Sequence, residues 1–378
     1  MNIKIDFDLH YFKECCYRRW GFRFRPGPLS SRIPEAGSVL SANPFFQPID
    51  YYQDNSRAKE VCCASGHCDW YYNLRPRPRF CLRLIPVRTA WFFGDPHINT
   101  LDGGKYTFNG YGEYTMMKID HNGTKFDLQA RTDLATNANG TTINATIFSA
   151  FVAKDQTGSI VQVEMSRNKK NMYVRGNGRD LTLEFENNPD YVFRTVNISI
   201  SMDNGTIEAS FIQSAITIKI SLGVRFLTSE TMVDEKYRGK VTGLMGNFDG
   251  NTTNDFILPN RTTLYGSNVD TERKIYNNFG QLWSINVTTS LFHYDTGLTH
   301  DEYSHPEFVP FFIDEFPEDK RNKSIEVCGG AKATQACIFD FLATGDQSLA
   351  EASGADDDTS ATDTASLGCI SNYRIPKT

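Results

Sequence analysis

The segment FGDPHINTLDGGKYTFNGYGEY, residues 93–114, places an aspartate, a proline and a histidine in direct succession. An aspartate carboxylate can attack its own peptide carbonyl to form a cyclic anhydride, and a proline nitrogen is a comparatively good leaving group once protonated. His97 is placed to donate that proton. Asp95, Pro96 and His97 therefore form a candidate self-cleavage site at the only Asp-Pro bond of the chain, although most such bonds are inert turn elements.

A second polar cluster lies in GLMGNFDGNTTNDF, residues 243–256, where Asn247, Asp249, Asn254 and Asp255 fall within nine residues. Closely spaced carboxylates and amides with backbone carbonyls between them form the hard-oxygen ligand set that calcium takes. The order of residues is not that of an EF-hand. The alternative is a loop of Asx-turns that binds nothing.

Motifs of the common enzyme classes are absent from the sequence. There is no G-x-S-x-G, H-E-x-x-H, Walker A or dinucleotide-binding pattern, and the seven histidines are scattered. We therefore expect a non-enzymatic protein whose only catalysis, if any, is a single cut at Asp95-Pro96.

Six of the nine cysteines lie within 67 residues and include two adjacent pairs. This density fits a small domain stabilised by disulfides. The alternative is a zinc site that includes His67, but the C-x2-C spacing typical of such sites is absent. Cys328 and Cys337 are close enough to close a short disulfide loop, and Cys369 is left over. The six clustered residues are Cys15, Cys16, Cys62, Cys63, Cys68 and Cys81.

Asparagine sequons indicate a glycosylated surface and hence the secretory pathway. With this content of Asn, Ser and Thr, chance predicts about four N-x-[ST] sites, and the chain has nine. The acceptors are Asn122, Asn139, Asn144, Asn197, Asn204, Asn251, Asn260, Asn286 and Asn322.

Charge is unevenly distributed over the net −6 of the chain. Residues 1–88 hold 14 Lys and Arg against 8 Asp and Glu, whereas residues 89–378 hold 25 against 37. The arginines of the first part, including Arg75, Arg77 and Arg79, would suit a sulfated glycan or another polyanion. Their spacing among aromatic residues is equally typical of stacking contacts within a small fold.

From residue 105 to about residue 228, alternating apolar stretches such as LTLEFE (residues 181–186) recur about every ten residues between Gly, Asn and Asp. This pattern predicts an antiparallel β-sandwich or barrel. After residue 265 the pattern becomes helical, and residues 353–367 are acidic and low in complexity, which favours disorder. The stretches predicted as helical are residues 271–283, 307–316, 323–330 and 334–353.

The clustered cysteines followed by the segment at residues 91–114 resemble the junction between an AMOP domain and a von Willebrand factor type D (VWD) domain. The pattern GDPH-x-x-TLDG-x-x-YTFNG-x-G-E-Y and, about 130 residues later, GL-x-GNFDG-x-x-x-ND-F are similar to the two ends of a VWD domain. The resemblance covers roughly residues 13–345. It is closest to the mucin-4-like transmembrane mucins, sushi-domain-containing membrane proteins and invertebrate mucin-like proteins.

The resemblance implies an extracellular adhesion or matrix module that binds calcium through Asp95, Asn247, Asp249, Asn254 and Asp255. Some members cleave themselves at the Asp-Pro bond of GDPH, and others keep it uncut. Residues 82–327 contain no cysteine, so disulfide-linked multimers of the gel-forming type are not expected. An Asp found in many members is Asn254 here, which removes one negative charge from the predicted site.

We therefore predict a mainly β protein: an AMOP-like disulfide-rich domain (13–88), a VWD-like β-sandwich (89–290), a helical extension (291–350) and a disordered tail (351–378). Its expected function is that of a calcium-stabilised adhesion or matrix glycoprotein that contacts extracellular proteins or glycans and no nucleic acid. The start of the chain has no apolar leader, so we expect an extracellular fragment of a secreted or membrane-tethered protein.

Overall fold

The computed structural model divides into two compact units, Val87–Thr364 and a unit formed by Met1–Pro86 with Ala365–Thr378. In the latter, β1 (Tyr11–Phe12) pairs with β4 (Val39–Leu40) and β2 (Tyr17–Trp20) with β3 (Arg23–Pro26). The arginines proposed for polyanion binding lie outside the described residues. The structure describes residues 11–12, 17–20, 23–26, 39–40, 61, 63–66, 87–94, 96–137, 139–188 and 191–354.

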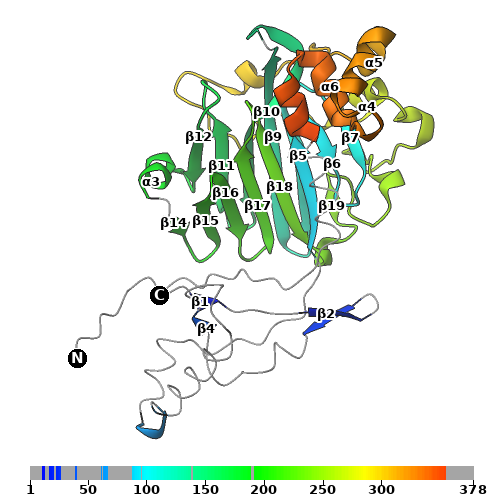
Figure 1. The fold of residues 1–378 in the computed structure, drawn as a ribbon. Coiled ribbons are helices and arrows are strands. Elements are labelled where there is room, and N and C mark those ends of the chain that lie inside the picture. The colour runs from blue at the N-terminus through cyan, green and yellow to red at the C-terminus, as the bar shows by residue number, and fades with distance from the viewer. Residues whose placement is uncertain are drawn as a thin grey trace. The chain divides into compact units, whose positions relative to one another are not determined.

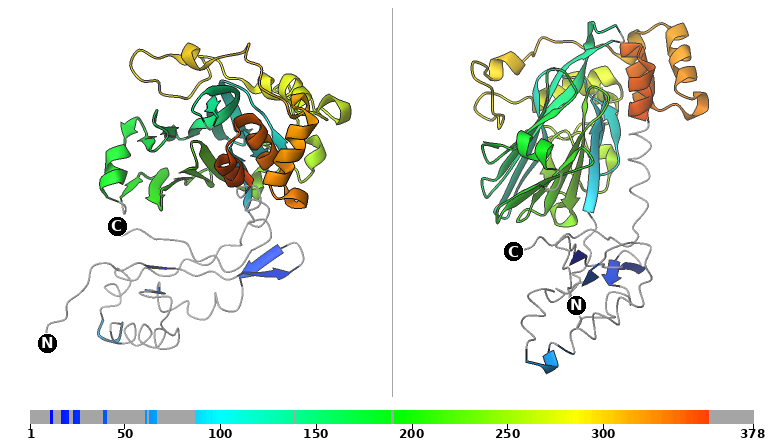
Figure 2. Two further views of the ribbon diagram at one scale, coloured as in Figure 1. Left: turned by 45° about the horizontal axis from the view of Figure 1, so that its top comes forward. Right: turned by 60° about the vertical axis from the view of Figure 1, so that its left-hand side comes forward.

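The larger unit contains two antiparallel sheets packed face to face (Figures 1 and 2), the sandwich that the sequence predicted. One sheet has seven strands in the order β13-β12-β11-β10-β9-β8-β19, and the other has eight in the order β14-β15-β16-β17-β18-β5-β6-β7. The strands are β5 (Val87–Phe93), β6 (His97–Asn99), β7 (Lys105–Thr107), β8 (Glu113–His121), β9 (Thr124–Thr136), β10 (Thr142–Asp155), β11 (Ile160–Met165), β12 (Met172–Gly176), β13 (Arg179–Asp180), β14 (Val192–Arg194), β15 (Ile198–Asp203), β16 (Thr206–Phe211), β17 (Ile216–Leu222), β18 (Leu227–Asp234) and β19 (Val241–Thr242).

Alternation of side chains explains why these segments form a sandwich. In β16 and β18 every second residue is buried, because successive side chains of a strand point to opposite faces. The buried side chains meet in one hydrophobic core, in which Phe92, Phe126 and Phe211 are fully buried. Met245 is fully buried in the same core. Because residues 82–327 contain no cysteine, the sandwich is held by apolar packing and not by disulfides.

Strand β5 lies inside the eight-stranded sheet and not at its edge. It pairs with β18 over Phe92↔Ser229 to Val87↔Asp234 and, on its other side, with β6. The chain before residue 95 therefore supplies an interior strand of the sandwich. The alternating pattern began only at residue 105, so the sequence did not predict this strand.

A strap, residues 284–305, crosses the outer face of the seven-stranded sheet. Gln129 of β9 donates to the carbonyl of Thr289 and accepts from the amide of Leu291. Gln162 of β11 makes the same pair of bonds with the backbone of His293. Because the strap covers that face, β10 is buried almost along its whole length and does not show the alternation of a half-exposed strand.

Glu113 of β8 joins the strap to the sheet through a buried ion pair. Its carboxylate accepts from Arg131 Nε of β9 at 3.0 Å and also from Ser290 Oγ, Tyr294 Oη and His300 Nδ1 of the strap. Arg131 lies under the strap, with its guanidinium 3.6 Å from the ring centroid of Tyr303. Both partners of the ion pair are about 2% exposed.

The C-terminal helices pack on the sandwich and share its core. They are α4 (Glu272–Asn278), α5 (Glu318–Val327), α6 (Gln335–Thr344) and a further helical stretch at residues 347–354. Phe339 and Ala343 of α6 belong to the same hydrophobic cluster as the sheets. Accordingly, the boundary predicted at residue 290 does not separate two cores, and α6 lies against the strands in Figure 1.

Three segments differ from the predicted elements. Residues 181–186, predicted as a strand, form helix α3 (Thr182–Asn187), because Asp180 Oδ1 accepts from the amide of Thr182 in an Asx-turn just before the helix and buried Leu181 and Phe185 have helical i,i+4 spacing. The helix predicted over 307–316 is only the 3-10 turn η7 (Ile313–Glu315), since Pro310 cannot donate a helical hydrogen bond.

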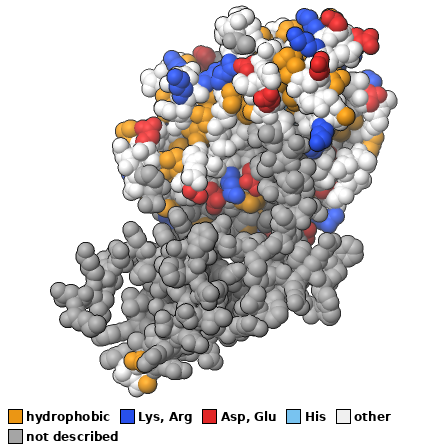
Figure 3. Space-filling model, in the orientation of Figure 1, with side chains coloured by type: hydrophobic (Ala, Val, Ile, Leu, Met, Phe, Trp, Pro, Cys, Tyr) orange, Lys and Arg blue, Asp and Glu red, His pale blue; other side chains and the backbone are white. Residues whose placement is uncertain are grey.

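The helical stretch at 347–354 also crosses the predicted start of the tail at residue 351, because Leu349 and Ser353 are buried. The rest of the predicted tail and Cys369 lie outside the described residues. On the face shown in Figure 3, the Lys and Arg side chains are interspersed with Asp and Glu and do not gather into a patch of one sign.

Replacing the carboxylate of the buried pair should destabilise the sandwich strongly. Glu113→Gln removes the buried counter-charge of Arg131 and leaves it only the partly exposed Glu164, whose Oε1 lies 3.4 Å from Nη1, so we expect a loss of about 3–5 kcal/mol in the free energy of unfolding. Denaturant unfolding measures this loss, and hydrogen exchange should show faster exchange in residues 284–305. The control is Asp270→Asn, which breaks the exposed ion pair with Lys274 and should cost less than about 1 kcal/mol. Equal losses in the two variants would contradict a structural role for Glu113.

Asp127 of β9 should make stability depend on pH. It pairs across the sheet with Lys118 and Lys154, and its Oδ1 is buried without a hydrogen-bond partner. Burial raises the pKa of this carboxyl above its ordinary 3.8, against the opposing effects of Lys118 and a hydrogen bond from Gln129. Because the pKa is higher in the folded state, the contribution of this group to stability falls as pH rises past 3.8 and through the folded pKa.

Asp127→Asn removes that dependence. The melting temperature of the variant, relative to wild type, should therefore be higher at pH 7.5 than at pH 3.5. Calorimetry at the two pH values measures the difference, with Asp120→Asn, an exposed aspartate of the same sheet, as the control. A shift that is the same at both pH values would show that burial of Asp127 does not perturb its titration.

Candidate functional site

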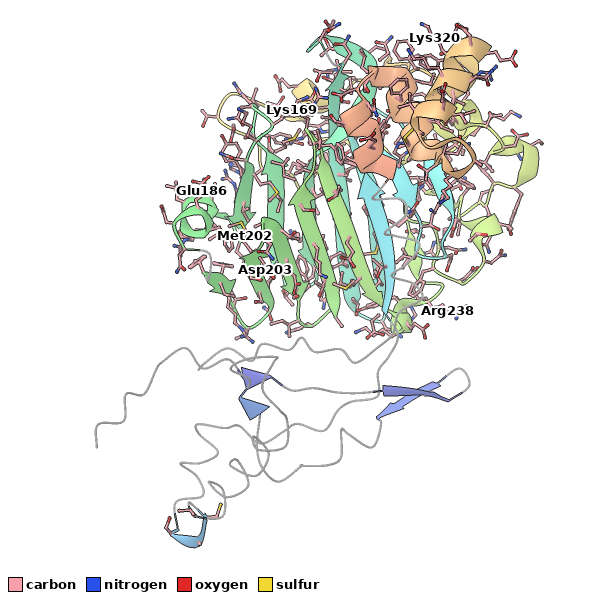
Figure 4. The ribbon with its side chains drawn as sticks, in the orientation of Figure 1. Lys169, Glu186, Met202, Asp203, Arg238 and Lys320 are labelled. Carbon is pink, nitrogen blue, oxygen red and sulfur yellow. A yellow bond between two sulfur atoms is a disulfide. The ribbon has the colours of Figure 1, made fainter. Side chains whose placement is uncertain are left out.

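Two glycines shape the loop at residues 243–256. Gly246 has φ +82°, and a Cβ on it would lie 2.3 Å from Asp255 Oδ1. Gly250 has φ +94°, and a Cβ there would lie 2.1 Å from the guanidinium of Arg238. Both positions combine left-handed backbone with close approach of a side chain, so only glycine fits. Arg238, labelled in Figure 4, donates twice to the carbonyl of Asp249 and fixes the loop at that end of the sandwich.

The loop brings together the polar residues that the sequence singled out. Asp249 Oδ2 accepts from Asn254 Nδ2 at 2.8 Å and from Asn247 Nδ2 at 3.1 Å. Asp255 Oδ1 accepts from the amide of Asn247 at 3.3 Å. The four side chains thus form one connected cluster in which Asn247 and Asp255 are buried.

Asp102, which the sequence analysis missed, completes this cluster. Its carboxylate accepts from the amides of Asp249 (2.9 Å) and Gly250 (2.7 Å), across 147 and 148 residues of sequence. Thr100 of the same segment donates to Asp255 Oδ2 at 2.6 Å. Burial raises the pKa of Asp255 to about 7, and the negative charge of Asp102 acts in the same direction.

Two features of this cluster would suit a cation. The charge of Asp102 lies close enough to Asp255 to oppose the ionisation of that carboxyl group. The buried Oδ1 of Asn254 has no hydrogen-bond partner. A rotation of the amides of Asn247 and Asn254 would exchange N and O and present two oxygens beside Asp249 Oδ2, which is a donor set of the kind calcium takes.

Carboxylate and imidazole side chains alone would not be sufficient to bind a cation at this loop. Among the described residues, no group of three or more His, Cys, Asp or Glu side chains is arranged to hold a metal ion. The candidate site depends on amide oxygens in addition to carboxylates. Asp95, the fifth predicted ligand, lies outside the described residues.

Around the predicted cleavage site, the structure describes Pro96 and His97. The carbonyl of Pro96 accepts from the amide of Phe108 at 2.9 Å. His97 is 4% exposed, with Nδ1 2.9 Å from Thr107 Oγ1 and Nε2 2.9 Å from Asp340 Oδ1 of α6. Asp340 lies 243 residues away in sequence, and no local pattern pointed to it.

The predicted disulfide and glycosylation residues occupy suitable positions where they are described. Cys328 and Cys337 form the disulfide that their spacing indicated, and Cys63 is disulfide-bonded. The other clustered cysteines, Cys15, Cys16, Cys62, Cys68 and Cys81, lie outside the described residues. The nine sequon asparagines all reach the surface; eight are exposed, and Asn197 is partly buried.

Comparison with known proteins agrees with these features. A model of the von Willebrand factor type D domain matches residues 90–262, and a model of the Mucin-4-like C8-3 domain matches residues 316–366. The chain contains a VWD domain. The 243–256 loop and the histidine of GDPH both belong to it, and α6 belongs to the C8-3 domain, which the sequence analysis read only as a helical extension. The AMOP interpretation of residues 13–88 stays a prediction.

Three relatives illustrate the arrangement. The chain is 29% identical to mouse Mucin-4 over 80% of its length, 27% identical to human Sushi domain-containing protein 2 over 90%, and 25% identical to Protein mesh of Bombyx mori over 90%. It spans 8%, 42% and 23% of these relatives, respectively. Within the described part of the chain, no helix has the length and apolar character needed to cross a bilayer.

Proposed function

We propose that this chain is an extracellular adhesion or matrix module whose VWD domain is stabilised by calcium bound in the 243–256 loop. The observation that carries the proposal is the convergence of Asp102, Asp249 and Asp255 with two side-chain amides at one end of the sandwich. The similarity to mucins and the nine surface sequons support the extracellular setting.

Calcium would act here by removing an electrostatic cost. Asp102 links the start of the VWD domain to the loop, and Thr100 links the same segment to buried Asp255. Without a cation, this segment and the loop bring like charges together. With a cation, those charges become ligands, and the two segments are held by one ion. The protein's own residues supply the orientation, because the glycines and Arg238 fix the loop backbone.

Chelation of calcium should lower the melting temperature. A ligand at about one hundred times its Kd stabilises a protein by about 2.7 kcal/mol, so we expect a fall of about 5–10 °C in EGTA relative to 1 mM calcium. Asp249→Asn should abolish the difference, and magnesium should not replace calcium. The matched control is Asp203→Asn, an exposed residue at the end of β15 that lies far from Arg238 in Figure 4 and should keep the full response. A melting temperature unchanged by EGTA in wild type would refute the site.

A second candidate function is self-processing at Asp95-Pro96. The observation that favours it is the environment of His97, which is buried and bonded through both ring nitrogens. A cut there would not release the N-terminal part at once, because β5 lies on one side of the bond and β6 on the other, and both are paired within the same sheet.

Intact mass and N-terminal sequencing of the secreted, deglycosylated chain test this function. We expect a fragment that begins at Pro96 and that co-elutes with residues 1–95 on native gel filtration but separates in denaturant without reductant. His97→Ala should remain uncut. A single uncut mass would leave the protein as a binding module without self-processing. The polyanion alternative through Arg75, Arg77 and Arg79 stays a prediction.

A further inference from the structure

His97 of the VWD domain is held by a carboxylate of the C8-3 domain. Asp340 is fully buried on α6, and its Oδ1 lies 2.9 Å from His97 Nε2. On the other side of the ring, Nδ1 lies 2.9 Å from Thr107 Oγ1 of β7. The ring is therefore fixed at both nitrogens, by residues 10 and 243 positions away.

Asp340 is itself positioned by three features of the C-terminal helices. Ser353 donates to its second oxygen, Oδ2. The neighbouring Phe339 packs edge-on against the imidazole of His97, with 6.1 Å between ring centroids. The Cys328–Cys337 disulfide joins α6 to the end of α5 just before Asp340 in the chain.

The backbone beside the predicted cut is shaped to accept this carboxylate. Gly94 has φ +60°, and a Cβ on it would lie 2.5 Å from Ser353 Oγ and 2.8 Å from Asp340 Oδ2. Only glycine allows so close an approach. The two C-terminal side chains thus contact the segment on which the predicted self-cleavage would take place.

We propose that Asp340 is a positioning residue for His97, so that the C8-3 domain forms part of the self-cleavage apparatus of the VWD domain; this inference rests on the self-processing function proposed above. A buried carboxylate on one ring nitrogen fixes the orientation of an imidazole and provides a counter-charge when the ring carries two protons. His97 acts on the scissile bond, and Asp340 acts through His97.

The reaction balances with water as the only co-reactant. The Asp95 carboxylate oxygen bonds to its own peptide carbonyl carbon, and the bond from that carbon to the Pro96 nitrogen breaks. The doubly protonated His97 gives one proton to this nitrogen, which becomes the new N-terminus. Water then opens the cyclic anhydride to leave both carboxyl groups of Asp95, and the imidazole regains its proton from solvent.

One further carboxyl faces this histidine. Burial raises the pKa of Glu272 at the start of α4, and the charge of His97 acts in the opposite direction. The pH profile of cleavage consequently reports on His97 together with Asp340 and Glu272, and it should be compared between variants and not read as the titration of one group.

The experiment compares Asp340→Asn and Ser353→Ala with the control Asp346→Asn in the full chain. Asp346 lies in the same C-terminal region, but its ion pair is with Arg225 and not with His97. We expect Asp340→Asn to slow the appearance of the Pro96 N-terminus roughly 10–100-fold and to change the pH profile. Ser353→Ala should give a smaller loss, and the control should cut at the wild-type rate. Melting temperatures establish that each variant is folded.

Cleavage of folded Asp340→Asn at the wild-type rate and with the wild-type pH profile would overturn the inference. If that variant does not fold, Ser353→Ala decides, and an unchanged rate there overturns it. An uncut wild type would refute the self-processing function and the role of Asp340 in it. In that case ¹⁵N spectra of His97 test separately whether Asp340 orients the imidazole ring. The ring signals should shift in Ser353→Ala, and unchanged signals would refute this role of Asp340.

Discussion

The buried ion pair between Glu113 and Arg131 is the interaction on which the arrangement of this molecule most depends. Removing two charges from water is costly unless every remaining bonding position is filled. The sheet alone cannot fill them, so the strap supplies Ser290, Tyr294 and His300 to Glu113 and an aromatic face to Arg131. The connection between the VWD and C8-3 domains is therefore a structural element of the sandwich.

The sequence predicted what depends on short-range pattern. Strands such as β16 and β18 alternate strictly because one face is buried and the other is not. The pattern failed where a third layer covers the sheet: β10 is buried on both faces, and the strap has polar contacts in place of a periodic apolar face. It also failed at residues 181–186, where a two-residue and a four-residue period both fitted, and the Asx-turn of Asp180 favoured the helix.

The candidate sites divide in the same way. Asn247, Asp249, Asn254 and Asp255 are close in sequence, so their type and spacing were sufficient to indicate oxygen ligands. Asp102 and Asp340 reach their sites across 147 and 243 residues, and only the fold shows that they belong there. The C8-3 helices were recognised as helical, but the buried carboxylate of α6 could not be distinguished from an ordinary core-facing polar residue.

One short segment, residues 94–104, connects both sites. At its start, Gly94 and His97 contact Asp340 and Ser353 of the C-terminal helices. Further along, Thr100 and Asp102 bond to the 243–256 loop, and the amide of Leu101 donates to the carbonyl of Met245. Both sets of contacts hold the same backbone. When one set has ordered this segment, the other therefore forms at a lower cost in conformational entropy. The residues that would bind a cation and those that would orient His97 therefore stabilise a common conformation of this segment.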